Sequence, residues 1–310
     1  MAVVNPNIHV LNQVSEALAD AVEHVGRSVV AVHAGRHGSA SGVLWRSGVV
    51  VTVAHAIRRD DGIQVSMPDG SRRDAALAGV DGSTDLAALK LDGEGQHVAD
   101  IGDATSVRTG QFVFAVARDA QGASSASFGI VGATQGEWRT WRGGRIDRLI
   151  RLDGSLYPGF SGGPIADMQG QVIGIGTQAL ARSFAIAIPA STVSRVAEQL
   201  LASGRIAHGY LGIGAQSVML PEPLTRKLGL ENRTGLIVLS LAPQGPAEQA
   251  GLLPGDILVE LAGRPLRDVD DLHGVLGGDR IGERVGVGVV RAGERIDSAI
   301  ILGERPRLRC

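Results

Sequence analysis

The sequence predicts that the first two thirds of the chain form an all-β barrel or sandwich, and two observations lead to this prediction. Between residues 28 and 190, at least ten short runs rich in Val and Ile alternate with Gly, Ser and Asp, as in short strands joined by tight turns. The 310 residues include 44 glycines but only 3% aromatic residues. Tight turns use glycine because they need positive φ, and the core must be built from Val, Ile, Leu and Ala.

Each predicted strand is an apolar run bounded by turn residues. In chain order the runs are SVVAVHAG, ASGVLWRSG, VVVTVAHAI, GIQVSMPDGS, DLAALKL, GQFVFAVA, FGIVGAT, RLIRL, GQVIGIGT and SFAIAIP. A helix is predicted before them, because residues 11–25 place apolar side chains on one helical stripe, which we interpret as a face packed on the barrel. That stripe consists of Leu11, Val14, Leu18, Ala21, Val22 and Val25.

A second helix is predicted at 191–204, where it would close the first domain. Val193, Val196 and Leu200 follow helical spacing. Ser191 or Thr192 could cap its start, and Gly204 could end it. After it, GYLGIGAQSV opens a second region of strands with two expected helices, PAEQAGL and VDDLHGVL. The length also predicts about two domains.

Composition excludes several classes of function. The formal net charge of −2 gives no overall field that would attract nucleic acid or acidic lipid, and no apolar run reaches the length of a membrane span. The single cysteine, Cys310, excludes an internal disulfide and a cysteine-rich zinc site. The N-terminal residues lack the pattern of a secretory signal, so the residues alone predict either a cytoplasmic location or an export signal that is absent from this chain.

The segment YPGFSGGP (157–164) places Ser161 among glycines. Serine hydrolysis needs an activated hydroxyl and backbone N–H groups aimed at the developing oxyanion. Gly159 allows a turn in which the N–H groups of residues 159 and 161 point to one spot, as an oxyanion hole requires. An ordinary turn would explain GxSGGP in isolation.

A base and an orienting carboxylate are expected at two other strand ends. His55 follows the apolar run VVVTV, and Asp85 in GSTDLAALKL precedes another. Taken singly, His55 would be read as a core histidine and Asp85 as a turn or cap residue. The order His55, Asp85, Ser161 is the one found in chymotrypsin-type double barrels.

These motifs resemble the HtrA (Deg) serine proteases, a chymotrypsin-like double β-barrel followed by a PDZ domain. TVAHAI, STDLAALK, GFSGGPI with GQVIGI, and FAIAIP leading to YLGI carry the resemblance. It implies a helical segment at 1–27, a trypsin-like serine protease domain at 28–205, a PDZ domain at 206–304 and a tail at 305–310. It also implies that His55 is the general base, Asp85 its orienting partner and Ser161 the nucleophile, with no metal or organic cofactor.

The chain departs from the family pattern at two positions. Val53 and Phe160 stand where the family usually has asparagine, and residue 160 lies inside the turn that forms the oxyanion hole.

Two functions are therefore expected. The first is an ATP-independent endopeptidase that degrades unfolded or damaged protein. The alternative is a protease-like scaffold or chaperone with a dormant site, acting through its PDZ domain.

The second region has the features of a module that captures a peptide C-terminus by strand addition. The loop of Tyr210, Leu211, Gly212 and Ile213 would bind the terminal carboxylate. The stretch 243–266 resembles the family's GPAxxAGLxxGDxI pattern. His273 and Leu276, on the predicted helix 269–276, are candidate contacts for the ligand side chain. Leu211 and Ile213 suggest an apolar C-terminal residue on that ligand.

Further features follow from the resemblance alone. Residues 137–148 would form a sensor loop, for which Arg–Trp stacking on the surface is an equally simple explanation. Segments 154–159 and 177–183 would line a specificity pocket for a small or medium aliphatic residue. The family is commonly trimeric and mostly works in the cell envelope, so a homotrimer and a periplasmic location are implied.

Overall fold

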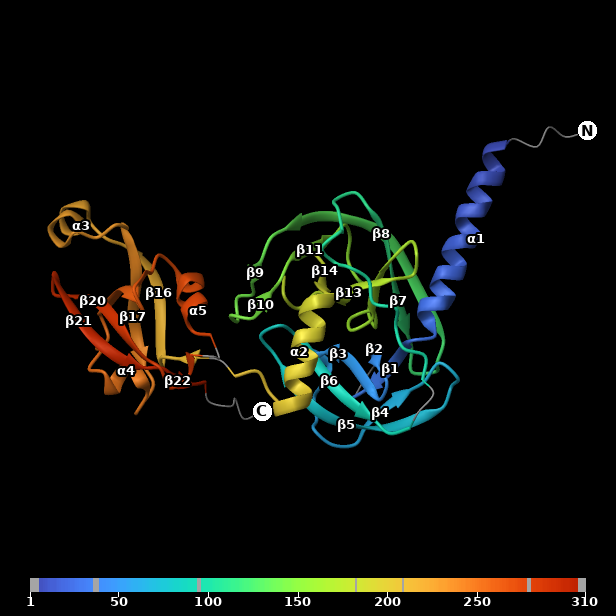
Figure 1. Cartoon of the computed structure of the whole chain (residues 1–310), viewed down its shortest axis with the longest axis horizontal. Coiled ribbons are helices and arrows are strands. Elements are labelled where there is room, and N and C mark those ends of the chain that lie inside the picture. Colours follow the sequence, from blue (N-terminus) through green and yellow to red (C-terminus); the bar gives the residue numbers. More distant parts are fainter. Residues whose placement is uncertain are drawn as a thin grey trace, which may run out of the picture. The chain divides into compact units, whose positions relative to one another are not determined.

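The computed structural model describes residues 6–35, 39–93, 96–181, 183–207, 209–277 and 280–305. The chain divides into two compact units, Met1–Ile206 and Ala207–Cys310, and each is described by itself (Figure 1). Residues 306–310, most of the expected tail and including Cys310, lie outside the described residues.

The first barrel of the first unit is a closed, six-stranded antiparallel barrel in the order β1-β2-β3-β6-β5-β4. Its strands are β1 (Val29–His33), β2 (Ala40–Arg46), β3 (Val49–Val53), β4 (Ile63–Ser66), β5 (Arg72–Asp81) and β6 (Leu86–Leu91). Five of these correspond to predicted runs. β5 was not predicted, because its alanines, glycine and charged residues have little strand preference of their own. It forms because β4 and β6 pair with it on both sides.

A second closed barrel follows in the order β11-β14-β13-β12-β7-β8, and the mainly β, double-barrel fold class is thereby confirmed. Its strands are β7 (Phe112–Arg118), β8 (Ser124–Gln135), β11 (Leu149–Leu152), β12 (Pro164–Asp167), β13 (Val172–Thr177) and β14 (Ile186–Pro189). A short hairpin of β9 (Trp138–Arg139) and β10 (Arg145–Ile146) lies between β8 and β11 in the chain.

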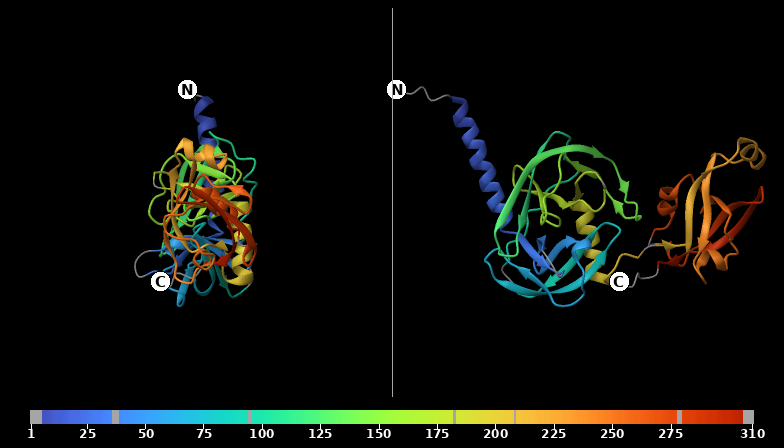
Figure 2. Two further views of the ribbon diagram at one scale, coloured as in Figure 1. Left: turned by 90° about the vertical axis from the view of Figure 1, so that its left-hand side faces the viewer. Right: turned by 180° about the vertical axis from the view of Figure 1, so that it is seen from behind.

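The N-terminal helix α1 (Pro6–Gly26) contacts the barrel only through its C-terminal half. Leu18, Ala21, Val22 and Val25 pack on the core. Leu11 and Val14, expected on the same buried stripe, are exposed. The physical reason is length, since the helix extends beyond the barrel that its last turns cover (Figures 1 and 2).

The helix that ends the first unit, α2 (Ala190–Ser203), terminates as predicted at Gly204, which has φ +75°. The predicted cap at Ser191 or Thr192 is wrong, because Pro189 occupies the N-cap position without a side-chain hydrogen bond. Thr192 is fully buried, and its Oγ1 accepts a hydrogen bond from the Asp147 N–H instead. A tertiary contact thus engages the Thr192 hydroxyl, which its position near the start of α2 would favour as a helix cap.

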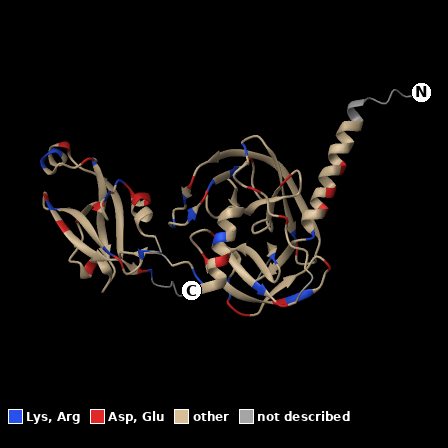
Figure 3. Ribbon diagram, in the orientation of Figure 1, with Lys and Arg blue, Asp and Glu red and all other residues tan. Residues whose placement is uncertain are grey.

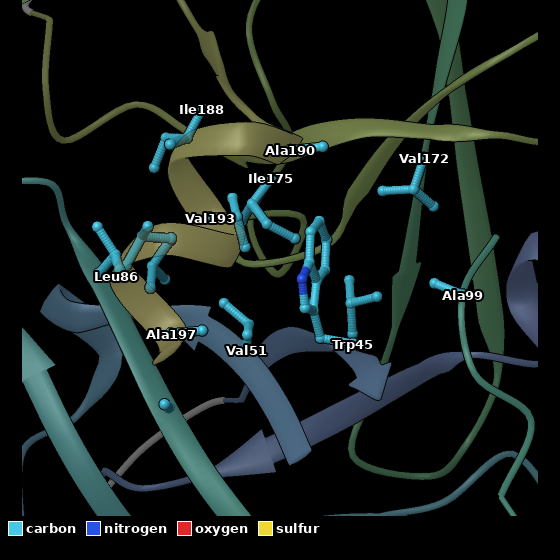
Figure 4. Packing of buried hydrophobic residues seen from close by; sticks show 14 of the residues in the cluster. Trp45, Val51, Leu86, Ala99, Val172, Ile175, Ile188, Ala190, Val193 and Ala197 are labelled. Carbon is cyan, nitrogen blue, oxygen red and sulfur yellow. The ribbon is translucent and has the colours of Figure 1, made fainter. Parts of the chain in front are cut away.

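The core of the first unit forms where α2 meets both barrels. The Trp45 indole from β2 lies among Val51, Ile175 and Val193, which come from β3, β13 and α2 (Figure 4). Its Nε1–H donates to Ser194 Oγ at 3.1 Å. A buried tryptophan usually finds such a partner for its N–H. The packing holds the two barrels in a fixed relation, on which any site between them depends.

The second unit is built on an antiparallel sheet in the order β16-β17-β18-β20-β21. The strands are β15 (Gly209–Tyr210), β16 (Ile213–Met219), β17 (Thr234–Leu241), β18 (Ile257–Leu261), β19 (Arg264–Pro265), β20 (Arg284–Arg291), β21 (Glu294–Ile301) and β22 (Gly303–Glu304). The helices are α3 (Glu222–Leu228), α4 (Pro246–Gln249) and α5 (Val269–Val275). Sequence periodicity missed α3, which spans only 7 residues. Across the described ranges, no helix has the length and apolar character of a membrane span.

Acidic and basic side chains are interspersed over both units (Figure 3). In one ion pair the carboxylate is buried: Arg291 Nε and Nη2 donate to the Asp256 carboxylate at 2.7 and 2.8 Å. These hydrogen bonds hold the pKa of Asp256 below its ordinary value near 3.8. The carboxylate therefore stabilises the fold above that value, and this stabilisation is lost as the pH falls through the lowered pKa.

Replacing Arg291 by methionine is expected to destabilise the second unit at pH 7, because Asp256 would then be a buried charge without this partner. The difference from wild type should shrink below about pH 4, where a protonated Asp256 tolerates burial. Thermal unfolding of the full chain between pH 3 and pH 7 measures both effects. The matched control is Arg267→Met, which breaks an exposed pair with Asp271. An equal decrease in thermal stability for Arg291→Met and Arg267→Met would contradict the prediction.

Candidate functional site

A cleft of about 720 Å³ in the first unit brings three of the predicted site residues together. His55, Gly159 and Ser161 all line it. The remaining lining residues are small or apolar except for the exposed Arg58, and they include Val32, Ala34, Ala40, Ala56 and Pro158. The cleft is thus formed by β1, the start of β2, the segment after β3 and the turn before β12.

His55 lies on η1 (Ala54–Ala56), a single 3₁₀ turn directly after β3. Its Nδ1 lies 2.9 Å from Asp85 Oδ2 and 3.0 Å from Oδ1, and its backbone N–H donates to Oδ1 at 3.0 Å. The His55 side chain is 43% exposed and that of Asp85 only 5%. A buried carboxylate on Nδ1 favours the tautomer in which Nε2 is free to accept a proton.

Asp85 immediately precedes β6 and adopts φ +59°, a conformation that is uncommon outside glycine but tolerated by aspartate. Its carbonyl accepts a hydrogen bond from the Ala54 N–H at 3.0 Å, which ties it to the residue before His55. The loop before it is held by Asp81, whose carboxylate accepts from the hydroxyls of Ser83 and Thr84 at 2.6 Å each. The orientation of Asp85 is therefore set by the loop as well as by His55.

Sequence reasoning missed Thr177, the last residue of β13. It is fully buried, and its hydroxyl donates to Asp85 Oδ2 at 2.6 Å. A second donor on this carboxylate fixes its rotation. The only sequence signal was a polar residue ending the apolar run GQVIGIGT, and nothing in that run indicates which residue it contacts.

Ser161 lies in the second of two consecutive tight turns. In the first, Phe160 N–H donates to Tyr157 O at 3.1 Å, with Pro158 and then Gly159 at φ +89° in the middle, as in a type II turn. In the second, Gly163 N–H donates to Phe160 O at 2.9 Å. In the described ranges the N–H groups of Gly159 and Ser161 donate to no acceptor. They are therefore available to a ligand in the cleft that both residues line.

Phe160, the departure inside this turn, points into the second barrel. It is 6% exposed and belongs to the apolar cluster that contains Leu156, Ile165, Ile173 and Ala187. Its ring also lies 6.1 Å from that of Tyr157. The side chain anchors the turn in the core and is not among the residues that line the cleft.

The expected sensor segment, 137–148, contains the β9–β10 hairpin and contacts the loop before Asp85. Thr140 Oγ1 donates to Ser83 O at 2.7 Å, and Arg142 donates to Gly82 O at 3.2 Å. The Arg142 guanidinium also stacks on the exposed Trp141 ring at 4.5 Å, so the Arg–Trp stacking considered from the sequence is present. Of the two expected specificity-pocket segments, 154–159 is fully described, whereas residue 182 of 177–183 lies outside the described residues.

In the second unit, the loop expected to bind a carboxylate joins β15 to β16. Gly212 has φ +76°, and the carbonyls of Leu211 and Gly212 accept hydrogen bonds from Ala247 N–H at 2.8 Å and Ala242 N–H at 2.7 Å. Leu211 is buried, whereas Tyr210 and Ile213 are half-buried. β16 lies at an edge of its sheet and contacts α5, which carries His273. Leu276 directly follows that helix.

The described residues contain no group of three or more His, Cys, Asp or Glu side chains placed to hold a metal ion. Comparison with family models assigns the same two regions. The model of the trypsin-like peptidase domain matches residues 40–175, and that of the PDZ domain matches residues 209–302.

Curated relatives match both regions. A probable periplasmic serine endoprotease, DegP-like, of Ectopseudomonas mendocina is 32% identical over 269 residues, which cover 85% of this chain and 56% of the relative. A putative serine protease HhoB of Synechocystis is 32% identical over 266 residues, covering 82% of this chain and 64% of the relative. This chain thus spans somewhat more than half the length of these relatives.

Solved structures match over nearly their whole length. The HtrA-type protease AlgW with a decapeptide aligns with a TM-score of 0.76 at 25% identity, covering 94% of this chain and 99% of that one. A serine endoprotease from Yersinia pestis aligns with a TM-score of 0.74 at 28% identity, covering 93% and 98%. The chain thus consists of a trypsin-like peptidase domain, closed as two barrels, followed by a PDZ domain, and over both domains it is similar to the DegP-like and HtrA-type proteases.

Proposed function

We propose that this chain is an ATP-independent serine endopeptidase that cleaves unfolded or damaged protein, with His55, Asp85 and Ser161 as its catalytic triad. The observation that carries the proposal is the cleft that Ser161 and the Asp85-bound His55 both line. An endopeptidase needs such a cleft open to an extended chain. The relatives named as serine endoproteases support the reaction class.

In the proposed mechanism, Ser161 Oγ attacks the carbonyl carbon of the scissile peptide while His55 Nε2 accepts the hydroxyl proton. Asp85 holds the imidazole through Nδ1 and stabilises its charged form. The N–H groups of Gly159 and Ser161 bind the oxyanion of the tetrahedral intermediate. His55 then gives its proton to the leaving amine, and water hydrolyses the acyl-enzyme by the same steps in reverse order.

We propose that each of the two units selects a different part of the substrate. Segments 154–159 and 177–183 contain no acidic residue, which favours a small or medium aliphatic side chain before the cleaved bond. The loop 210–213 and the free edge of β16 would take a peptide C-terminus, since a backbone with Gly212 at positive φ can approach a carboxylate closely. AlgW, which aligns over nearly the whole chain, was solved with a decapeptide.

The test is to incubate the full chain with unfolded casein and with a stably folded protein, and to label it separately with a fluorophosphonate probe. Cleavage of the unfolded substrate and a probe adduct on the peptide containing Ser161 are expected. A Ser161→Ala variant serves as the blank. An unlabelled Ser161 in a folded chain would instead support the alternative of a protease-like scaffold that acts through its PDZ domain.

Two further properties belong to the same proposal. A homotrimer and a periplasmic location rest on the family and on relatives named as periplasmic. Sedimentation should give three times the 32.1 kDa mass of one chain, and fractionation of the source cells should recover the protein with periplasmic markers. A monomer mass at working concentration, or recovery with the cytoplasm, would reject the respective part.

A further inference from the structure

Ser41, the second residue of β2, is a fully buried serine in contact with the turn that carries Ser161. Its hydroxyl donates to Gly159 O at 2.7 Å. Its backbone N–H is shared between Gly159 O at 3.2 Å and Ser161 O at 3.1 Å. A residue of the first barrel therefore binds the backbone on both sides of Phe160 in the second.

The polar atoms of Ser41 are all engaged. The hydroxyl oxygen accepts a hydrogen bond from the Arg118 N–H at 3.0 Å, which leaves its proton directed at Gly159. The Ser41 carbonyl accepts from Thr52 Oγ1 at 2.7 Å. The Arg118 side chain is itself buried and donates to the carbonyls of Gly26 and Val29. With each partner fixed by another hydrogen bond, the Ser41 hydroxyl has one orientation.

The bonds to Gly159 O hold one of the two peptides that meet at Gly159, the one that joins it to Phe160. Glycine tolerates several backbone conformations, so φ +89° at Gly159 is not enforced by its own side chain. A carbonyl held by the Ser41 hydroxyl fixes the peptide after Gly159. The turn bond from Phe160 N–H to Tyr157 O holds the opposite edge of the same peptide. Without the hydroxyl, Gly159 O would keep only the longer, shared bond from the Ser41 N–H.

We propose that Ser41 is a positioning residue for the oxyanion hole: by holding the Gly159–Phe160 peptide, it fixes the backbone at Gly159 from which the N–H faces the cleft. The inference rests on the proposed serine endopeptidase activity. Ser41 does not touch substrate in this role. Loss of its hydroxyl lowers the fraction of molecules whose oxyanion hole is formed, and the rate falls with that fraction.

The test compares Ser41→Ala with wild type in peptide hydrolysis. We expect kcat to fall about 10- to 100-fold with KM within about twofold, which is less than the roughly 10²- to 10³-fold loss of a deleted oxyanion donor. Affinity for a peptide aldehyde, which needs the oxyanion hole, should fall in parallel with kcat. Ser41→Thr, which keeps a hydroxyl, should lie closer to wild type than alanine does.

Ser28→Ala is the matched control, because Ser28 is equally buried and its hydroxyl donates to the Val25 carbonyl at 2.8 Å, away from the cleft. It should leave kcat and aldehyde affinity unchanged. A Ser41→Ala variant with wild-type kcat, or one whose loss is matched by Ser28→Ala, would overturn the proposal.

Hydrogen exchange provides a readout that does not need activity. The segment 157–163 should exchange its amides faster in Ser41→Ala than in wild type, whereas Ser28→Ala should not change it. If the wild type is inactive but segment 157–163 still exchanges faster in Ser41→Ala, the endopeptidase proposal is refuted and the structural role of Ser41 is supported. Unchanged exchange would refute the positioning role even if the wild type is active.

Discussion

Replacing Asp85 by asparagine is expected to lower kcat for peptide hydrolysis about 10⁴-fold with little change in folding. The two side chains have the same shape, so the bond from the Thr177 hydroxyl can persist. An amide in place of the carboxylate can donate to His55 Nδ1, which places the ring proton on Nε2. In that tautomer His55 cannot accept the proton of Ser161. The carboxylate that stabilises the charged ring is also lost.

The chain offers a matched control for this variant. Asp100 also contacts a histidine, with its Oδ2 2.8 Å from His24 Nε2, but this pair is exposed and lies outside the cleft. Asp100→Asn should keep wild-type kcat and KM. Initial rates on one peptide substrate, with thermal unfolding of each variant, measure the effect. An Asp85→Asn enzyme within tenfold of wild type would show that Asp85 does not orient the base.

Truncating Phe160 to alanine is expected to reduce the free energy of unfolding of the first unit by about 3–5 kcal/mol, as for other buried phenylalanines. The ring is 6% exposed and packs with Leu156, Ile165 and Ile173. Its removal leaves a cavity directly beneath the nucleophile turn. Phe160→Asn, which introduces the residue usual in the family, should be destabilising as well, because this apolar surrounding has no partner for a buried amide.

Denaturant unfolding of the full chain measures this loss, and Phe112→Ala is the control. Phe112 also contacts an aromatic ring, with its centroid 5.1 Å from that of Phe128, but it is 53% exposed. Its truncation should cost less than about 1 kcal/mol, because little apolar area returns to water. If Phe160→Ala costs no more than Phe112→Ala, the ring does not anchor the turn.

Local patterns were sufficient for most elements of the first unit. The ten predicted runs all contain strands, and α2 ends at Gly204 as predicted. β12 (Pro164–Asp167) was missed because it directly follows the nucleophile turn and has only 4 residues. The capping of α2 was wrong because Thr192 is drawn into a contact with Asp147, which lies 45 positions away in the chain. Residue preferences describe a segment on its own and carry no information about such distant partners.

The sequence by itself determined the β class of the first unit, because its strands are local apolar runs bounded by turn residues. The resemblance of its motifs to the HtrA (Deg) proteases implied the double barrel, the PDZ region and the three residues proposed for catalysis. Only the tertiary structure decided what holds those residues in place. The Asp85 carboxylate is bound by Thr177, 92 positions later, and the Gly159 carbonyl by Ser41, 118 positions earlier. These serine and threonine hydroxyls have no distinguishing sequence pattern. Their roles arise because closing two barrels side by side brings one strand end within hydrogen-bond distance of Asp85 and the other within hydrogen-bond distance of the nucleophile turn.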